Sequence, residues 1–186
     1  MPRWRLWLGG ALIAVGLVAA GLRLVPALTD ASLKIDLQPL QSADPAIRLT
    51  EVGDGVVTVY ADVTQARDAA DNFDKAAATV TAAGQALKRG VSDDLRGANT
   101  VRFSIRCQAT NRSGQDVMAQ LVTLDAPLAI LKAVDYGRTR PADVLGLAEK
   151  VKLGAPGAYD AIAAWCADPA RAGKAFCGKA NSQSAN

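Results

Sequence analysis

The chain contains no histidine and only two glutamates, Glu51 and Glu149, among its 186 residues. Histidine is the commonest general base near neutral pH and the commonest metal ligand, so its absence removes the usual catalytic and metal-binding arrangements. The sequence also lacks the Gly-x-Ser-x-Gly, P-loop and Ser-x-x-Lys motifs. We therefore expect a protein that is not an enzyme and that has neither a metal site nor a cofactor.

An excess of basic residues is missing from most of the chain. The 21 basic and 18 acidic residues give a net charge of +3, and the arginines before residue 24, Arg3, Arg5 and Arg23, account for all of it. The remaining 18 basic residues balance the 18 acidic ones. Proteins that bind nucleic acid normally carry concentrated positive charge for the phosphates. We therefore expect no nucleic-acid partner.

One long apolar run lies near the N-terminus. Residues 6–22 carry no charge, and the apolar character resumes after Arg23 as far as Leu28. If Arg23 extends toward the headgroups, residues 6–28 are long enough to cross a bilayer core of roughly 30 Å. We predict a transmembrane anchor over residues 6–28. The alternative is a cleaved secretory signal, for which the small residues at 18–20 provide a site.

The residues that flank this run predict its orientation. Arg3 and Arg5 precede it, and the positive-inside rule keeps a stub of residues 1–5 in the cytoplasm. The rest of the chain then lies on the outer side of a bacterial inner membrane, with the lipid bilayer as a partner. Small residues recur at a spacing that lets transmembrane helices approach and oligomerise: Gly10, Ala14, Gly16 and Ala20.

The exported part divides into three segments. Residues 29–46 form a linker, in which the alternation of Leu33, Ile35 and Leu37 indicates a short strand. A tether without fixed structure is the alternative. Residues 47–177 form the exported domain, and residues 178–186 are a polar tail that we expect to be disordered.

Alternating apolar and polar residues predict the strands of this domain. Residues 47–63 indicate a hairpin that turns at Gly53-Asp54-Gly55. This tripeptide could also belong to a cation loop, but the acidic ladder of a calcium site is absent. Strict alternation from Thr100 to Thr110 predicts a strand with one face on the core, and residues 116–124 form its return strand.

Helices account for most of the remaining sequence. Residues 64–89 predict one long, alanine-rich helix, with an apolar stripe at Phe73, Val80 and Leu87. Further helix starts predict a helical C-terminal third, over residues 126–135, 141–153 and 156–167. We therefore expect an α+β fold in which these helices pack on a mainly antiparallel sheet. The helical connection before Thr100 also allows one parallel strand pair.

The three cysteines have two expected roles. Cys107 lies on the core face of the alternating strand, where a free thiol acts as a small apolar filler. Cys166 and Cys177 are eleven positions apart, and in an exported domain we favour a structural disulfide between them. A reduced pair and a redox centre are the alternatives. The redox centre lacks the short Cys-x-x-Cys spacing of thiol oxidoreductases.

A group of arginines is the remaining surface feature. Arg102 and Arg106 share the solvent face of the alternating strand, Arg96 precedes the strand and Arg112 lies in the turn after it. Such a row could contact anionic lipids or an acidic protein partner. An ordinary solvated strand has the same pattern, and that alternative stays open.

Together these features favour a single-pass, membrane-anchored domain that binds or scaffolds other proteins in an envelope assembly. The neutral exported domain, the short cytoplasmic stub and the missing catalytic motifs support this hypothesis. A soluble periplasmic protein that binds a small apolar ligand between its sheet and helices is the first alternative. The low aromatic content of 5% argues against that pocket. A thiol-disulfide redox protein that uses Cys166 and Cys177 is the second alternative.

Overall fold

The structure is a computed structural model that describes residues 37–64, 66–90, 95, 97–154 and 156–184. The predicted stub, the span over residues 6–28 with its small residues, and Arg96 all lie outside the described residues. Within the described part of the chain, no helix combines the length and the apolar character that crossing a membrane requires.

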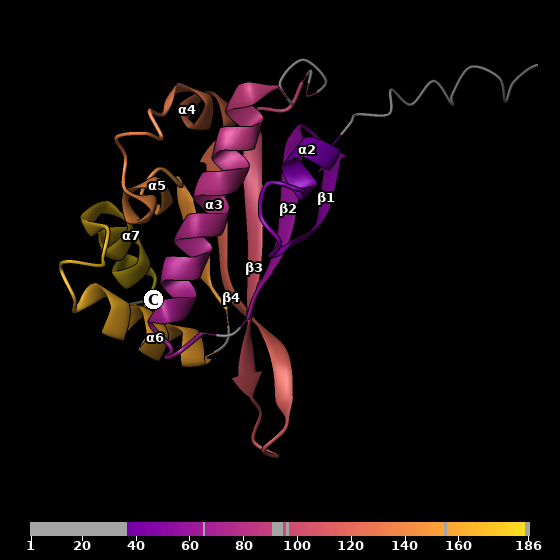
Figure 1. Cartoon of the computed structure of the whole chain (residues 1–186). Helices are drawn as coiled ribbons and strands as arrows, with labels where there is room; N and C mark the ends of the chain where they lie inside the picture. Colours follow the sequence, from indigo (N-terminus) through magenta and orange to yellow (C-terminus); the bar gives the residue numbers. More distant parts are fainter. Residues whose placement is uncertain (1–36, 65, 91–94, 96, 155, 185–186) are drawn as a thin grey trace, which may run out of the picture. The chain divides into compact units, whose positions relative to one another are not determined.

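Five described strands form one sheet in the order β1-β2-β3-β4-β5 (Figure 1). The strands are β1 (Ile47–Gly53), β2 (Val56–Val63), β3 (Thr100–Thr110), β4 (Asp116–Pro127) and β5 (Lys150–Leu153). β2 and β3 run parallel, because helix α3 (Asp71–Arg89) carries the chain back to the end of the sheet at which β2 begins. The other three pairs are antiparallel. The predicted α+β fold is therefore confirmed, with one parallel pair in a mainly antiparallel sheet.

The hairpin at the start of the sheet follows its predicted turn. Asp54 and Gly55 have φ angles of 52° and 74°, the left-handed values that a two-residue hairpin connection requires. Glycine reaches this region at no steric cost, and aspartate tolerates it better than most residues. β1 and β2 therefore pair directly, from Gly53 opposite Val56 onward.

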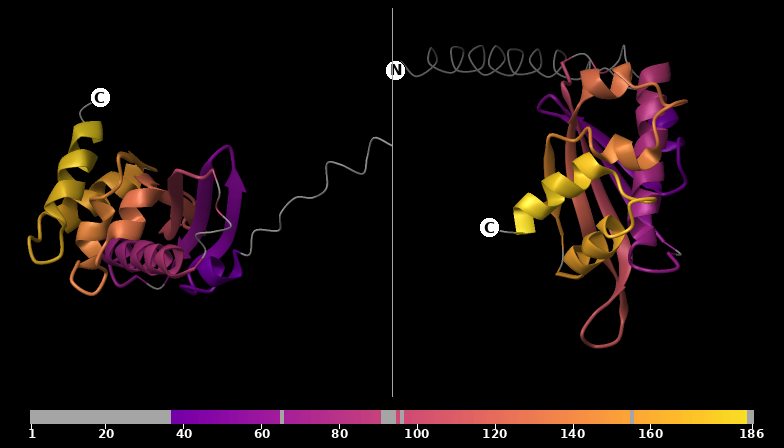
Figure 2. Two further views of the ribbon diagram at one scale, coloured as in Figure 1. Left: turned by 90° about the horizontal axis from the view of Figure 1, so that it is seen from above. Right: turned by 90° about the vertical axis from the view of Figure 1, so that its left-hand side faces the viewer.

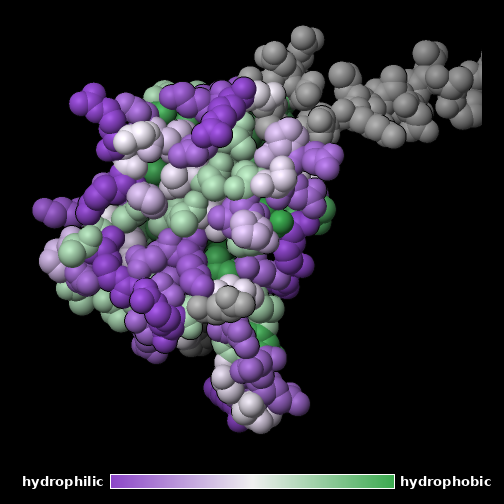
Figure 3. Space-filling view, viewed as in Figure 1, coloured by the Kyte–Doolittle hydropathy of each residue, from purple (hydrophilic) through white to green (hydrophobic). Residues whose placement is uncertain are grey.

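The described helices cover one face of the sheet (Figures 1 and 2). Besides α3 they are α2 (Gln38–Gln41), α4 (Leu128–Ala133), α5 (Pro141–Leu145), α6 (Pro156–Cys166) and α7 (Lys174–Ser184). The predicted stripe of α3 is fully buried, with Phe73, Val80 and Leu87 at most 2% exposed. It packs against the apolar face of β2 and β3, where Val59 and Phe103 are buried. Figure 3 shows hydrophilic side chains around this helical side and less polar residues along its middle.

Two predictions in the N-terminal half need correction. Residues 32–36 of the predicted linker strand lie outside the described residues, but the linker contains the helix α2, whose Leu40 is fully buried. Pro39 occupies one of the first helical positions, where its missing N–H is harmless. The long helix begins at Asp71 and not at residue 64. The loop before it is held by two hydrogen bonds to carboxylates. The Arg67 backbone N–H donates to the Asp71 side chain, and the Asp71 backbone N–H donates to the Asp68 side chain. Short polar side chains compete in this way with the helical backbone.

Three predictions in the C-terminal third are also wrong. The predicted helix over residues 126–135 is only α4, because β4 continues to Pro127 by pairing with β3 and β5. The predicted helix over residues 141–153 is the short α5 followed by the strand β5. The tail predicted to be disordered from residue 178 belongs to α7, which extends to Ser184. It is anchored because Phe176 and Ala180 are fully buried.

Candidate functional site

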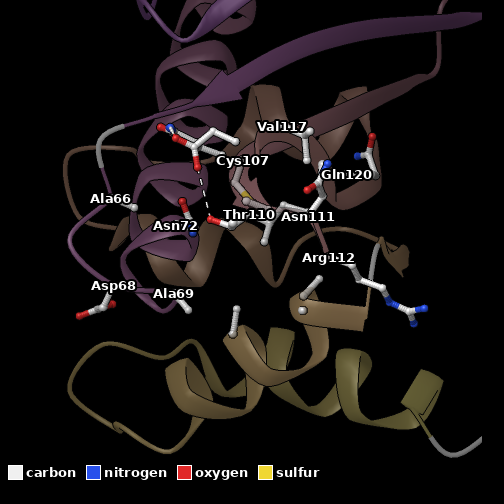
Figure 4. A pocket seen from close by; sticks show the side chains of 18 residues that line it. Ala66, Asp68, Ala69, Asn72, Cys107, Thr110, Asn111, Arg112, Val117 and Gln120 are labelled. Carbon is white, nitrogen blue, oxygen red and sulfur yellow. Dashed lines mark hydrogen bonds between the residues drawn. The ribbon is translucent and has the colours of Figure 1, made fainter. Parts of the chain in front are cut away.

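A cleft of about 870 Å³ lies between the far end of the β3–β4 hairpin and the N-terminal ends of α3 and α6 (Figure 4). The hairpin extends beyond the helices, as Figure 1 shows, so its last residues have no helix directly on them. The same face of the sheet that forms the core elsewhere is therefore open here. We call this space the hairpin cleft.

The floor of the hairpin cleft consists of small residues on β3 and β4. Cys107 pairs with Ala119, and Ala109 pairs with Val117. Alternation along the strands turns these four side chains toward the helical side. Cys107 is 8% exposed, whereas Val117 is 39% exposed. The floor thus changes from buried core to an exposed apolar surface within two residue pairs.

The α3 wall contributes a polar side chain. Asn72 lines the cleft and is 8% exposed as a whole residue, and its side-chain amide bonds to no other described residue. The amide atoms are open to solvent, since among the described residues the Thr50 hydroxyl is the buried side-chain group without a hydrogen bond. The neighbouring carboxylates are already engaged, since Asp71 accepts the Arg67 N–H at 2.9 Å. This hydrogen bond is the main reason why the pKa of Asp71 lies below its usual value. The amide of Asn72 is left for a group that enters the cleft.

The α6 wall is lined by residues with almost no side chain. Gly157, Ala158 and Ala161 face the cleft, and the two alanines are at most 5% exposed. Two more alanines, Ala66 and Ala69, lie on the α3 side. The cleft is therefore open because its walls are built from glycine and alanine around a few polar groups.

A β-bulge shapes the inner end of the cleft. The register of β3 and β4 shifts between Ile105 and Arg106, which leaves Leu121 as an extra residue on β4. The side-chain amide of Gln120 satisfies this bulge by donating to the carbonyls of Ile105 and Val122, at 2.9 and 2.8 Å. The bulge marks the point at which the packed sheet gives way to the free hairpin.

Beyond the bulge, one edge of β4 has no strand beside it. β5 pairs only with Val122 to Asp125, and the Gly154 N–H then donates to the Leu121 carbonyl at 3.0 Å. No described strand pairs with the outer edge of β4 from Asp116 to Gln120. This free edge borders the hairpin cleft, because Asp116 and Gln120 are among its lining residues.

The chemistry of the cleft is that of binding groups. The Cys107 thiol is free, and burial raises its pKa, so it remains protonated and a poor nucleophile near neutral pH. Asp68, Asp116 and Arg112 place both signs of charge at the rim. Thr110 donates to Asp116 at 3.3 Å (dashed line in Figure 4). Among the described residues, no group of three acidic or cysteine side chains is placed to hold a metal ion.

The arginines predicted to form an interaction face do not act as one basic row. Arg102 and Arg106 share the uncovered face of the sheet, but each makes two hydrogen bonds to a carboxylate on a neighbouring strand. Arg102 binds Asp125 at 2.7 and 2.8 Å. Arg106 binds Asp62 at 2.9 and 3.0 Å. Their positive charge is therefore compensated within the sheet.

These ion pairs lower the pKa values of the two carboxylates. They leave little uncompensated positive charge for a partner. Hydrogen bonds from Arg106 lower the pKa of Asp62, and Arg48 contacts the same carboxylate at 2.6 Å. A hydrogen bond from Arg102 is the main cause that lowers the pKa of Asp125. Arg112, the fourth predicted residue, lies apart from them at the rim of the hairpin cleft.

The structure joins Cys166 and Cys177 in a disulfide between the end of α6 and α7, with Cα atoms 5.8 Å apart. Phe73, Trp165 and Phe176 form an aromatic cluster beside it, with ring centroids 5.8 to 6.0 Å apart. We call these five residues together with Asp74 and Arg171 the disulfide corner. Such packing of fully buried rings is that of a structural staple.

A single acidic side chain ties this corner to α3. Asp74 accepts the indole N–H of Trp165 at 2.7 Å. It also accepts two hydrogen bonds from the Arg171 guanidinium, one of them from Nε at 2.9 Å. Asp74, which the sequence pattern indicates only as a helix-start carboxylate, thus connects α3 to the C-terminal helices.

No protein-family model, curated protein or solved structure matches this chain. The site must therefore be interpreted from its own geometry. The alternation of the strand correctly predicts Cys107 on its core face. It does not indicate the cleft above Cys107 or the position of Asn72 in that cleft. The one signal that could have pointed there is the length of the alternating strands, which exceeds the length of sheet that the helices cover.

Proposed function

We propose that this chain is a non-catalytic binding domain, anchored by one membrane span on the outer side of a bacterial inner membrane. It acts within an assembly of envelope proteins, and the hairpin cleft is its binding site. The observation that carries the binding site is the cleft itself. It combines an open floor of small residues, the Asn72 amide, which bonds to no other described residue, and an edge of β4 that has no described strand beside it.

The cleft supports this proposal better than the uncovered face of the sheet does. On that face the charged side chains are already paired, as Arg102 with Asp125 and Arg106 with Asp62. A partner that bound there would have to break those pairs or accommodate them. In the cleft, Asn72 and the edge of β4 exchange hydrogen bonds to water for bonds to a ligand and break none within the fold.

The membrane location rests on the sequence of residues 1–28. A long uncharged run follows two arginines, which is the arrangement of an anchor with a cytoplasmic N-terminus. The linker that follows then presents the domain close to the membrane surface. A disulfide between Cys166 and Cys177 is compatible with an oxidising compartment on the outer side.

A second candidate function is a soluble periplasmic protein that binds a small ligand. One observation favours it: the cleft lies between the sheet and two helices, which is where a small-ligand pocket is expected in such a protein. Carbonate extraction of native membranes separates the two candidates. An anchored chain stays in the membrane pellet at its full-length mass, and a cleaved chain is released at a mass lower by about twenty residues.

Site-specific photo-cross-linking tests the binding site in cells. A photoreactive amino acid replaces Val117 at the cleft in one variant and Lys152 on the uncovered face in a matched variant. Both positions are exposed, so both probes reach the surroundings. We expect a discrete cross-linked product from position 117 and none from position 152.

The reverse pattern, with products only from position 152, would contradict the proposal and return the binding site to the uncovered sheet face. Adding the substitution Ala119→Phe to the Val117 variant supplies a further control. A phenyl ring on the cleft floor fills space next to Cys107, and we expect it to remove the cross-link while the fold persists. Unchanged cross-linking in this double variant would exclude the cleft.

A further inference from the structure

The outer edge of β4 presents its backbone hydrogen-bonding groups in a regular pattern. The Asn111 N–H donates to the Gln115 carbonyl at 2.8 Å, so this pair is a hydrogen-bonded one. Bonded and non-bonded pairs alternate along an antiparallel ladder. Asp116, Met118 and Gln120 on β4 lie in the non-bonded pairs, opposite Thr110, Gln108 and Arg106. Their backbone N–H and C=O groups therefore point away from β3.

An independent distance supports this direction for Gln120. A Cβ atom built on Gly154 would collide with the Gln120 carbonyl oxygen, so this carbonyl points outward from β4 and is covered there by the Gly154 backbone. The four residues from Asp116 to Ala119 stay without a neighbouring described strand and span about 13 Å at about 3.3 Å per residue. An extended segment of similar length can therefore add to this edge as a further strand.

The walls of the cleft suit a polypeptide backbone. Asn72 carries both a donor and an acceptor in one planar amide, and each peptide group of a ligand offers the complementary pair. The amide atoms are open to solvent, so a ligand that enters the cleft exchanges their bonds to water for its own. Gly157 and Ala158 on the opposite wall leave room for small or medium side chains.

Charge at the rim gives the segment a direction. Antiparallel pairing is slightly more stable per residue than parallel pairing, and a segment antiparallel to β4 has its carboxyl end beside the hairpin turn. Arg112 lies in that turn and forms no ion pair with any described residue. Asp116 is nearby, but Thr110 and Gln108 already donate to its carboxylate.

We propose that the hairpin cleft binds an extended peptide segment of a partner protein, added antiparallel to the free edge of β4 with an acidic or carboxylate end beside Arg112. This inference rests on the proposed function, because it names the class of partner for the same cleft. Strand addition gives affinity through the backbone, and the alanine-lined walls select small side chains at alternate positions.

Met118 provides the sharpest test, because its N–H faces the free edge. The substitution Met118→Pro removes that donor, and proline is tolerated in a strand where the N–H does not serve the ladder. Met118→Val is the matched control, since it changes the same side chain and keeps the N–H. Both variants are prepared as the full-length chain in lipid nanodiscs, and thermal unfolding verifies that both are folded.

The probes are fluorescent positional-scanning heptapeptide libraries, made with either a free or an amidated C-terminus. We expect binding to the unchanged protein and to Met118→Val, and weakening by about tenfold in Met118→Pro. Asn72→Ala weakens binding by about fivefold to tenfold for the same reason. Arg112→Glu reduces the preference for the free carboxylate, and this effect diminishes at high salt.

Hydrogen exchange supplies a readout that a merely structural role would not change. The backbone amides of Asp116 and Met118 should exchange more slowly when the best library peptide is bound. Equal peptide binding by Met118→Pro and Met118→Val would overturn strand addition. A concentration-dependent dimer that Met118→Pro abolishes would overturn it in favour of a second copy of this chain.

The design also separates failure of this inference from failure of the proposed function. If no peptide library binds while the position 117 cross-link persists in cells, the cleft is a binding site for another class of ligand and the peptide inference is wrong. If both experiments are negative, the proposed function is wrong as well.

Discussion

Asn72 and Asp74 lie two positions apart at the start of α3, yet they face regions with opposite properties. Asp74 faces the disulfide corner, where it accepts hydrogen bonds from Trp165 and Arg171. Asn72 faces the hairpin cleft, where its amide is open to solvent and bonds to no other described residue. About half a turn of helix therefore separates a polar side chain that holds the fold together from one that is available to a ligand.

The two regions differ in the same way as these two residues. The disulfide corner is fixed by a covalent bond, by three aromatic rings in contact and by a shared carboxylate. The hairpin cleft is lined by alanine and glycine and is bordered by an unpaired strand edge. A rigid corner next to an open cleft holds the α6 wall in place, which is how a binding site is kept ready for its ligand.

The largest expected effect on stability comes from the aromatic cluster of the corner. Trp165 is fully buried and touches Phe73 and Phe176. We expect Trp165→Ala to lower the free energy of unfolding by about 3–5 kcal/mol, measured by chemical denaturation. Tyr159→Ala on the same helix is the control, since Tyr159 is 38% exposed and its loss should cost about 0.5 kcal/mol or less. Similar losses in both variants would contradict the role of the corner.

Removal of the disulfide has the next largest effect. The bond closes a loop with a sequence separation of 11, and the chain-entropy relation gives a stabilisation of about 3 kcal/mol for it. We expect this loss in the Cys166→Ser, Cys177→Ser double variant, and a matching loss when the unchanged protein is reduced. A double variant that keeps its stability but loses binding would instead support a redox role.

The pair Asp74→Leu and Asn72→Leu tests the comparison most closely. Asp74→Leu leaves the indole N–H of Trp165 and the Arg171 guanidinium without their acceptor, so we expect a loss of about 2–3 kcal/mol. Asn72→Leu removes a solvent-accessible amide that bonds to no other described residue, so stability should change by about 0.5 kcal/mol or less. Denaturation curves measure both changes. A large loss in Asn72→Leu would show that Asn72 serves the fold and not a ligand.

The smallest expected effect is a pH dependence that arises outside both regions. The pKa values of Asp62, Asp71 and Asp125 are lowered in the folded chain, mainly by hydrogen bonds from Arg106, the Arg67 backbone and Arg102. Each carboxyl then stabilises the fold above its unfolded pKa of about 3.9, and this contribution disappears as pH falls through the folded value.

We therefore expect the free energy of unfolding to be constant between about pH 7 and pH 5 and to fall below about pH 4. The partner guanidinium groups are well exposed, so each pair contributes little. The chain has no histidine to titrate in the intermediate range. A loss of stability between pH 7 and pH 5 would contradict this account, and denaturation at a series of pH values measures it.

The sequence was sufficient to predict elements whose signal is local. Strict alternation predicted β3 at its observed bounds, and Asp54 with Gly55 predicted the first hairpin. The strand β5 was missed because its four residues resemble the end of a helix until β4 provides hydrogen bonds for them. The start of α3 was missed because Asp68 and Asp71 bond to the loop backbone, which composition alone does not reveal.

The hairpin cleft could not be predicted from the sequence, because it depends on strand order and on helix position. Only the completed sheet shows that β5 ends opposite Val122 and leaves residues 116–119 of β4 without a neighbouring described strand. The same limit explains the arginines: Arg102 and Arg106 share a face as expected, but their partners Asp125 and Asp62 lie on neighbouring strands. A local pattern indicates which side chains share a face and not which groups lie opposite them.

The alkylation rate of a cysteine placed at Val117 tests most directly whether the cleft is occupied in cells. Val117 is 39% exposed at the cleft, and the buried Cys107 is replaced by alanine so that the new thiol is the one that reacts. The rate is measured by mass spectrometry in native membranes and again after purification in detergent with high salt. The account predicts slower alkylation in native membranes by about tenfold, because a bound partner covers the thiol. Equal rates in both preparations would contradict the assignment of the hairpin cleft as the binding site.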